Sequence, residues 1–255
     1  MKWLGLFILL SLVSRPVIAQ WEVKKDTAVG AGQFVFDERR FPVKPFILPF
    51  SLMVAGFIAE RTDPSLDLNE YFQEEIWTEN PHPNTTVDNY LQFAPAAAVF
   101  TLNVVGIKGR NNLLDESMIY LMSNIIMNTV VTITKNVTHE LRPDGSDYKS
   151  FPSGHTAEAF LSADFLYQEY RDVSPWYGVA GYGVAATVGY LRMYNNKHWF
   201  NDVVAGAGFG MASTRLTYWL YPKIKRLFAK NKPMTTMILP YYNNSTGGIT
   251  LAHIF

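Results

Sequence analysis

The sequence has no cysteine and no excess of charge of either sign. Its 255 residues include 22 lysines and arginines against 22 aspartates and glutamates. The absence of cysteine excludes a disulfide framework, a cysteine-ligated zinc and a thiol nucleophile. The balanced charge argues against a nucleic-acid partner, because proteins that neutralise many phosphates normally carry a basic excess.

The composition is moderately apolar, with 48% hydrophobic residues and a mean hydropathy of 0.00. This apolar fraction supports a sizeable core and excludes a chain that is mainly disordered. The length allows one large domain, or two at most. The mean hydropathy is high for a soluble enzyme and low for a chain that crosses a bilayer many times, so it leaves a membrane location open.

The first 19 residues have the pattern of a secretory signal peptide. Lys2 supplies the positive start, an apolar run covers 3–13, and small or modest side chains at 17–19 precede a cleavage site before Gln20. The run is short for a membrane span, so an uncleaved anchor is the second interpretation. We therefore predict a signal peptide over 1–19 and an exported protein.

Apolar segments separated by polar turns predict an all-α fold, a bundle of about six helices. Some segments approach the roughly 20 residues of a membrane span, so the bundle is expected to be membrane-embedded or membrane-associated. One segment carries Glu158, Asp164 and Glu169, which are expensive in lipid, and a soluble bundle therefore stays open. The predicted helical segments are 45–59, 89–107, 117–134, 156–170, 173–191 and 203–214.

Small residues recur every four positions in two of these segments. Gly181, Ala185 and Gly189 share one face, and Gly206 and Gly210 share another. Such a stripe lets two helices approach closely. No strand precedes the second group, and its spacing is not that of a dinucleotide-binding loop. We interpret both groups as helix-packing surfaces.

Cationic and imidazole side chains gather in three short motifs. Three cations at the ends of apolar helices, without a local carboxylate, need an anion to offset their desolvation. Arginine suits paired hydrogen bonds to phosphate oxygens, and backbone N–H groups just before a helix attract anions. The pattern therefore predicts a phosphoryl site. The motifs are Lys135 with Arg142-Pro143, then Pro152-Ser153-Gly154-His155, then Arg192 with His198 and Asp202.

His198 and Asp202 are four residues apart, which brings them together on one helix face. An aspartate that accepts from one imidazole nitrogen leaves the other nitrogen to act as a nucleophile or base. His155 supplies a second imidazole, suited to protonating a leaving oxygen. No further histidine has a second ligand at metal spacing, so we predict no metal and no other cofactor.

The pattern K-x6-RP, PSGH, R-x5-H-x3-D resembles the type-2 phosphatidic acid phosphatase superfamily. The resemblance implies an all-α, metal-independent phosphohydrolase with a phosphohistidine intermediate. By position, it makes His198 the nucleophile, Asp202 its orienting partner and His155 the acid for the leaving group. One departure is Leu191, where the superfamily usually has serine. The residues that the resemblance assigns to phosphate binding are Lys135, Arg142, Ser153, Gly154 and Arg192.

Four regions follow from these patterns. After the signal peptide, 20–90 holds N-terminal helices and an acidic loop, whose carboxylates we expect to be solvated. The phosphatase core covers 91–222. The remainder, 223–255, is a basic tail followed by a small β-hairpin around a turn-rich centre at 243–248.

The first functional hypothesis is a cell-envelope phosphatase acting on a lipid or polyprenyl (pyro)phosphate, in contact with membrane lipids. The alternatives are a soluble periplasmic acid phosphatase of broad range, a vanadate-dependent haloperoxidase, and a non-catalytic membrane scaffold. Loop charges favour an active site on the non-cytoplasmic side. A cleaved signal peptide would place Gln20 outside and invert that orientation, so both arrangements stay open.

Overall fold

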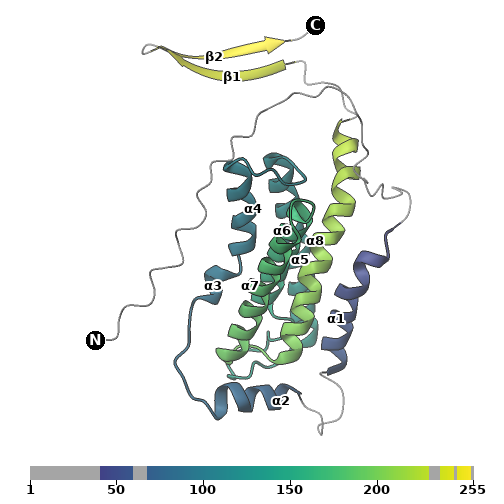
Figure 1. Ribbon diagram of the computed structural model, residues 1–255, viewed down its shortest axis with the longest axis vertical. Coiled ribbons are helices and arrows are strands. Elements are labelled where there is room, and N and C mark those ends of the chain that lie inside the picture. Colours follow the sequence, from purple (N-terminus) through teal and green to yellow (C-terminus); the bar gives the residue numbers. More distant parts are fainter. Residues whose placement is uncertain (1–40, 60–67, 230–235, 244–245, 254–255) are drawn as a thin grey trace, which may run out of the picture. The chain divides into compact units, whose positions relative to one another are not determined.

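The computed structural model describes residues 41–59, 68–229, 236–243 and 246–253 (Figure 1). The predicted signal peptide, 1–19, lies outside the described residues. Among these residues the fold is all-α apart from one strand pair: β1 (Thr236–Asn243) runs antiparallel to β2 (Thr246–His253), with Asn243 opposite Thr246.

The described residues contain eight α-helices rather than about six. Seven of them overlap the predicted segments, because 89–107 is divided into α3 and α4, and the addition is α2, which is too short and polar for an apolar pattern to reveal. A 3₁₀ turn, η1 (Lys44–Phe46), precedes α1, and a π-helical turn, η3 (Glu74–Thr78), continues α2. The helices are α1 (Ile47–Ala59), α2 (Leu68–Gln73), α3 (Asp88–Leu91), α4 (Ala94–Val104), α5 (Leu113–Thr138), α6 (Gly154–Tyr170), α7 (Pro175–Tyr194) and α8 (Phe200–Ala229).

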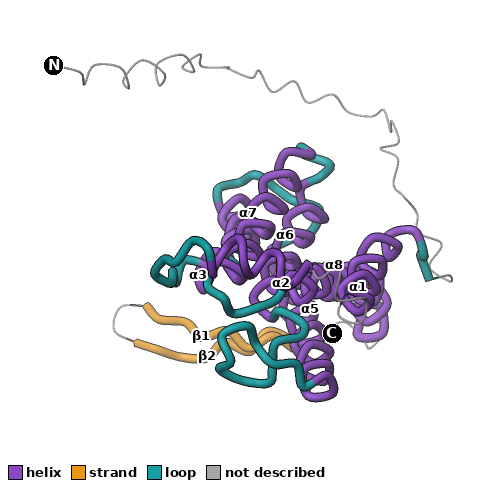
Figure 2. Tube along the Cα trace, turned by 90° about the horizontal axis from the view of Figure 1, so that it is seen from below, coloured by secondary structure: helices purple, strands orange, loops and turns teal. Residues whose placement is uncertain are grey.

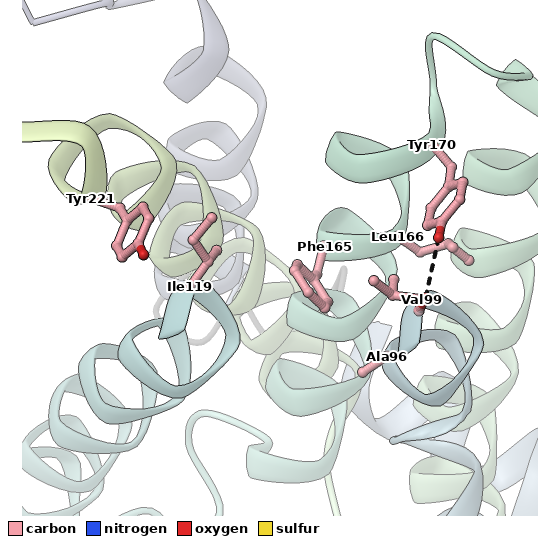
Figure 3. Packing of buried hydrophobic residues seen from close by; sticks show 7 residues of the cluster. All are labelled: Ala96, Val99, Ile119, Phe165, Leu166, Tyr170 and Tyr221. Atoms are coloured by element: carbon pink, nitrogen blue, oxygen red, sulfur yellow. Dashed lines mark hydrogen bonds between the residues drawn. The ribbon is translucent and has the colours of Figure 1, made fainter. Parts of the chain in front are cut away.

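Helix α6 is the centre of the bundle and packs against α4, α5, α7 and α8. Phe165, Leu166 and Tyr170 of α6 join apolar side chains of α4, α5 and α8 in one buried cluster (Figure 3). The Tyr170 hydroxyl donates to the Val99 carbonyl at 3.2 Å, which ties α6 to α4. Burial on all sides makes α6 the scaffold from which the site is built.

The acidic residues of α6 are enclosed by protein and paired there. Tyr120 donates its hydroxyl to Glu158 at 2.7 Å, and Arg215 forms an ion pair with Asp164 at 2.9 Å. Glu169 accepts from the Asn111 backbone N–H at 2.8 Å. A carboxylate that is expensive against lipid is tolerated when a partner faces it inside the bundle. The charges of α6 therefore do not oppose a membrane location.

Glycines set the close contact between α6 and α8. A Cβ at Gly206 would lie 2.6 Å from the Ser153 carbonyl oxygen, and one at Gly210 would lie 2.1 Å from the Ala157 carbonyl oxygen. On the other side, α8 packs against α1 (Figure 2), where Gly208 meets the Pro49 carbonyl. The predicted packing role of Gly206 and Gly210 agrees with these distances, which leave no room for a side chain.

Within the described residues, α5 is the helix whose length and hydropathy would allow it to cross a bilayer, and 22% of its apolar window is buried. Helix α4 and the segment 44–58 are apolar but shorter. Most of the apolar surface of α5 is therefore uncovered by the rest of the bundle.

Candidate active site

The site is built around His198, in the turn between α7 and α8. His198 is 3% exposed, and its Nδ1 lies 3.2 Å from Oδ2 of Asp202. His198 precedes the helix and Asp202 lies in its first turn, so they meet across a helix start rather than along one face. Oδ2 also accepts the Trp199 backbone N–H at 2.8 Å and the Ser150 hydroxyl at 2.5 Å. These donors hold the carboxylate in place, and the carboxylate in turn holds the imidazole.

The other predicted basic groups lie close enough to His198 for their charges to act on it. Burial lowers the pKa of His198 well below its ordinary value, and the positive charges of Arg192, Lys135 and Arg142 act in the same direction. Burial raises the pKa of Asp202, while the Ser150 hydroxyl and the Trp199 N–H oppose that rise. A neutral imidazole is therefore kept inside a cationic surrounding, which is the form that can act as a nucleophile.

The second motif forms the first turn of α6. The Ser153 hydroxyl accepts from the Thr156 backbone N–H at 3.4 Å and from the Thr156 hydroxyl at 2.9 Å, so Ser153 caps the helix. The Ser153 backbone N–H donates to the Asp202 carbonyl at 3.0 Å, which joins the second motif to the third. Nothing lies within 4 Å of where a Cβ of Gly154 would be. An anion can approach the backbone of this turn closely.

Each of the three cations has a protein partner in this structure. Lys135 donates to the carbonyl oxygens of Lys149 and Ser150, at 2.5 and 3.1 Å. Arg142 pairs with Asp147 at 2.8 Å. Both partners of Lys135 are neutral carbonyl oxygens. The positive charge of Lys135 is therefore still available to an anion.

Arg192 is paired with Asp88 at 2.5 Å, so the expectation that these cations lack a nearby carboxylate is wrong for Arg192 as well as for Arg142. Asp88 is 1% exposed, which also corrects its assignment to a solvated acidic stretch. The Nε of Arg192 is buried without a hydrogen-bond partner. A buried donor in that state is an open position for an acceptor such as a phosphate oxygen.

Asn89, beside Asp88, is a second residue that the motifs did not reveal. Its Oδ1 lies 2.9 Å from Nε2 of His155. Asp88 and Asn89 begin α3, at the start of an uncharged segment. In the sequence, the only indication of a role for them is that two polar residues stand together there. Their partners are 104 and 66 residues away, beyond any local pattern.

A small, open hollow lies beside His198. Helix α2 provides one wall through Asn69, Phe72 and Gln73, and the turn before α8 provides the other. Among the described residues there is no group of three histidine, aspartate or glutamate side chains arranged to hold a metal.

An all-α core with a buried histidine–aspartate pair and three cations that act on that histidine is an arrangement that can bind a phosphoryl group. Residues 116–226 match the sequence model of the PAP2 superfamily, and this segment holds all the predicted site residues. This segment is therefore similar to the PAP2 superfamily, and the resemblance carried by the motifs is confirmed over it.

Two curated proteins show related sequences. The lipid A 1-phosphatase of Porphyromonas gingivalis is 39% identical over 144 residues, which cover 56% of this chain and 32% of that protein. The bacitracin transport permease protein BcrC of Bacillus licheniformis is 29% identical over 120 residues, 46% of this chain and 54% of BcrC. The chain thus spans about a third and about half of these relatives.

Two solved structures were also matched, both at 20% sequence identity. The crystal structure of LpxE from Aquifex aeolicus aligns with a TM-score of 0.39, over 66% of this chain and 93% of that one. The PAP2-type phosphatidylglycerolphosphate phosphatase of Bacillus subtilis aligns with a TM-score of 0.45, over 70% and 98%.

Proposed function

We propose that this protein is a metal-independent phosphohydrolase that removes phosphate from a phosphorylated lipid through a phosphohistidine on His198. One observation carries the proposal. A buried, neutral His198 is held by Asp202 at Nδ1 and is faced by Arg192, Lys135 and Arg142. The nucleophile and the cations that would bind the phosphate therefore belong to the same site.

Phosphate binding uses groups that already converge. The buried Nε of Arg192 gains an acceptor, and Lys135 and Arg142 add positive charge. The first turn of α6, with open space at Gly154, offers backbone N–H groups at the positive end of a helix dipole. These donors also stabilise the charge that builds on the equatorial oxygens during transfer.

In the first step, Nε2 of His198 attacks phosphorus while the bond from phosphorus to the leaving oxygen breaks. The carboxylate of Asp202 accepts from Nδ1–H and stabilises the positive charge that the ring acquires. The leaving oxygen receives its proton from His155. The products of this step are the dephosphorylated lipid and an N–P bond on His198.

In the second step, a water molecule attacks phosphorus and the N–P bond breaks. His155, now neutral, takes a proton from that water, so the same ring serves first as acid and then as base. Inorganic phosphate leaves and His198 returns to its neutral form. The proton that His155 gave in the first step is regained here, and no metal is needed to balance either step.

The substrate class is a lipid because the site adjoins a bundle with a bare apolar surface on α5. The 39% identity to a lipid A 1-phosphatase places lipid A first among substrates to test, and polyprenyl pyrophosphate second. Membrane lipids then surround the bundle. The site would meet such a substrate on the non-cytoplasmic face of the membrane.

The test is phosphate release in detergent from lipid A, phosphatidate, phosphatidylglycerol phosphate and undecaprenyl pyrophosphate. His198→Ala should lower release at least about 1000-fold, because the nucleophile is lost. His139→Asn is the matched control. His139 is exposed, at a φ of 50° that asparagine tolerates, and release should stay within about twofold.

A second measurement tests the intermediate. Rapid alkaline quenching followed by mass spectrometry should find a phosphate on the peptide that contains His198, and none in His198→Ala. Equal phosphate release by wild type and His198→Ala would overturn the mechanism, and no release from any substrate would overturn the function.

A further inference from the structure

Helix α3 holds two of the predicted site residues through adjacent side chains. Asp88 binds Arg192 of α7, and Asn89 contacts His155 of α6. α3 itself packs against both α6 and α7. It therefore bridges the second and third motifs, although it lies outside the segment that matches the superfamily model.

The backbone around Asn89 is fixed independently of His155. The Asn89 N–H donates to the Thr86 carbonyl at 3.2 Å, and Gln92 donates its side-chain amide to the Asn89 carbonyl at 2.8 Å. The buried ion pair of Asp88 anchors the same turn to α7. These contacts fix the backbone of Asn89, which holds its carboxamide in place against the imidazole of His155.

The contact decides which nitrogen of His155 carries hydrogen. A carboxamide oxygen can only accept, so Nε2 of His155 must be the N–H partner of Oδ1. In the neutral ring the lone pair is then on Nδ1. His198 has the opposite arrangement, with Nδ1 held by Asp202 and Nε2 left to react.

We propose that Asn89 is a positioning residue for the hydrolysis set out above: it holds Nε2–H of His155, so that Nδ1 donates the proton to the leaving oxygen and later takes one from water. The balance is simple. The positively charged ring, with hydrogen on both nitrogens, gives up the Nδ1 proton, becomes neutral with Nε2–H still donated to Asn89, and regains the Nδ1 proton and its positive charge in the second step. This inference rests on the proposed function.

A neutral partner suits an acid. Burial, with the positive charge of Arg192 second, lowers the pKa of His155 to about 4, so its protonated form gives up a proton readily. A carboxylate in place of the carboxamide would stabilise the protonated ring. The charged groups that act on His155 are Arg192 of α7, Asp88 of α3, Arg142 of the loop before α6 and Lys135 of α5.

Asn89→Asp tests the contact by changing one charge at nearly constant shape. The pH at which kcat falls on the basic side, where His155 loses its proton, should move upward by about 1 to 3 pH units. Asn89→Ala should lower kcat about tenfold with KM unchanged, because one hydrogen bond to the acid is lost. Tyr90→Ala is the control on the same helix, because Tyr90 is 79% exposed.

Histidine-labelled protein gives a readout that does not depend on turnover. In an NMR titration, Asn89→Asp should raise the midpoint of His155 and leave that of His198 nearly in place. Unchanged pH profiles and an unchanged His155 midpoint in Asn89→Asp would overturn the proposal. If the wild type hydrolyses no lipid phosphate, the proposed function fails, while the titration still decides whether Asn89 holds His155.

Discussion

Among the single residues of the site, Arg192 differs from Lys135 and Arg142 in having a buried carboxylate partner. Its side chain is 9% exposed and that of Asp88 is 1% exposed, so both charges are out of water. Asp147, the partner of Arg142, is 46% exposed, and solvent screens that pair. The pair that costs most to break is therefore Arg192 with Asp88.

Asp88→Asn should lower the free energy of unfolding by about 3 to 5 kcal/mol, because it leaves a buried guanidinium without its counter-charge. Unfolding in detergent by denaturant measures this loss. Inorganic phosphate should restore part of it, because an anion that binds only the folded state stabilises that state.

Asp144→Asn is the control for this variant. Asp144 pairs with Lys197 in an exposed loop, and such pairs contribute at most about 1 kcal/mol. A loss in Asp88→Asn no larger than in Asp144→Asn would show that the buried pair is not what stabilises this end of the bundle. Equal stabilisation of wild type and Asp88→Asn by phosphate would contradict the role of Arg192 in anion binding.

The limit of sequence-based prediction at this scale is distance along the chain. His198 and Asp202 could be paired because helical spacing relates residues four apart. Lys135 and Arg192 could be grouped because a resemblance supplied the order of the motifs. Asp88 could not be joined to Arg192, since no periodicity connects residues 104 apart.

At the scale of helices, apolar periodicity found the long ones, merged the short α3 with α4, and passed over α2. Helix α2 is held by tertiary contacts: Asn69 accepts from the Asn201 N–H at 3.0 Å, and the Phe72 ring stacks on Phe200 at 4.7 Å. A helix of six residues has little stability of its own. Its existence depends on a partner surface that is not visible in its own sequence.

Gly210→Ala should separate α6 from α8, because the added Cβ would lie 2.1 Å from the Ala157 carbonyl oxygen and 2.8 Å from the Leu161 nitrogen. Both atoms are backbone and cannot rotate away. We expect a loss of about 1 to 3 kcal/mol or more in the free energy of unfolding. Activity should fall as well, since α6 and α8 begin at the site with Gly154 and Phe200.

Gly183→Ala is the matched control, because nothing lies within 4 Å of the added Cβ and the residue is exposed on α7. This variant should be neutral or more stable by about 0.5 to 1 kcal/mol, as expected for alanine over glycine within a helix. Equal stability of the two alanine variants would mean that α8 can shift away from α6 without cost.

The whole molecule combines a polar, charged site with a long apolar surface on α5. The site lies near the C-terminal end of α5, where Lys135 is, and the loop from α4 enters at its N-terminal end. At 1.5 Å per residue, the 26 residues of α5 are roughly 39 Å long. Composition alone left a membrane location open, because it averages this apolar surface with the charges of the site.

The lack of cysteine makes the membrane arrangement directly testable, since each introduced thiol is unique in the chain. Ile125 lies mid-way along α5 and is 57% exposed. In membranes, Ile125→Cys should resist a water-soluble maleimide and should react once denaturant replaces the lipid. Tyr148→Cys, in a loop beside the site with Tyr148 61% exposed, should react in both conditions.

Intact cells then report the side of the membrane. An impermeant maleimide that reaches the outer face of the inner membrane should label Tyr148→Cys, if the site faces the exported side as proposed. Val105→Cys, with Val105 66% exposed beside the loop at the other end of α5, should be labelled only after permeabilisation. The reverse pattern would place the site inside. Equal labelling of all three thiols before permeabilisation would mean that α5 does not cross a bilayer, because lipid would then shield none of its apolar surface.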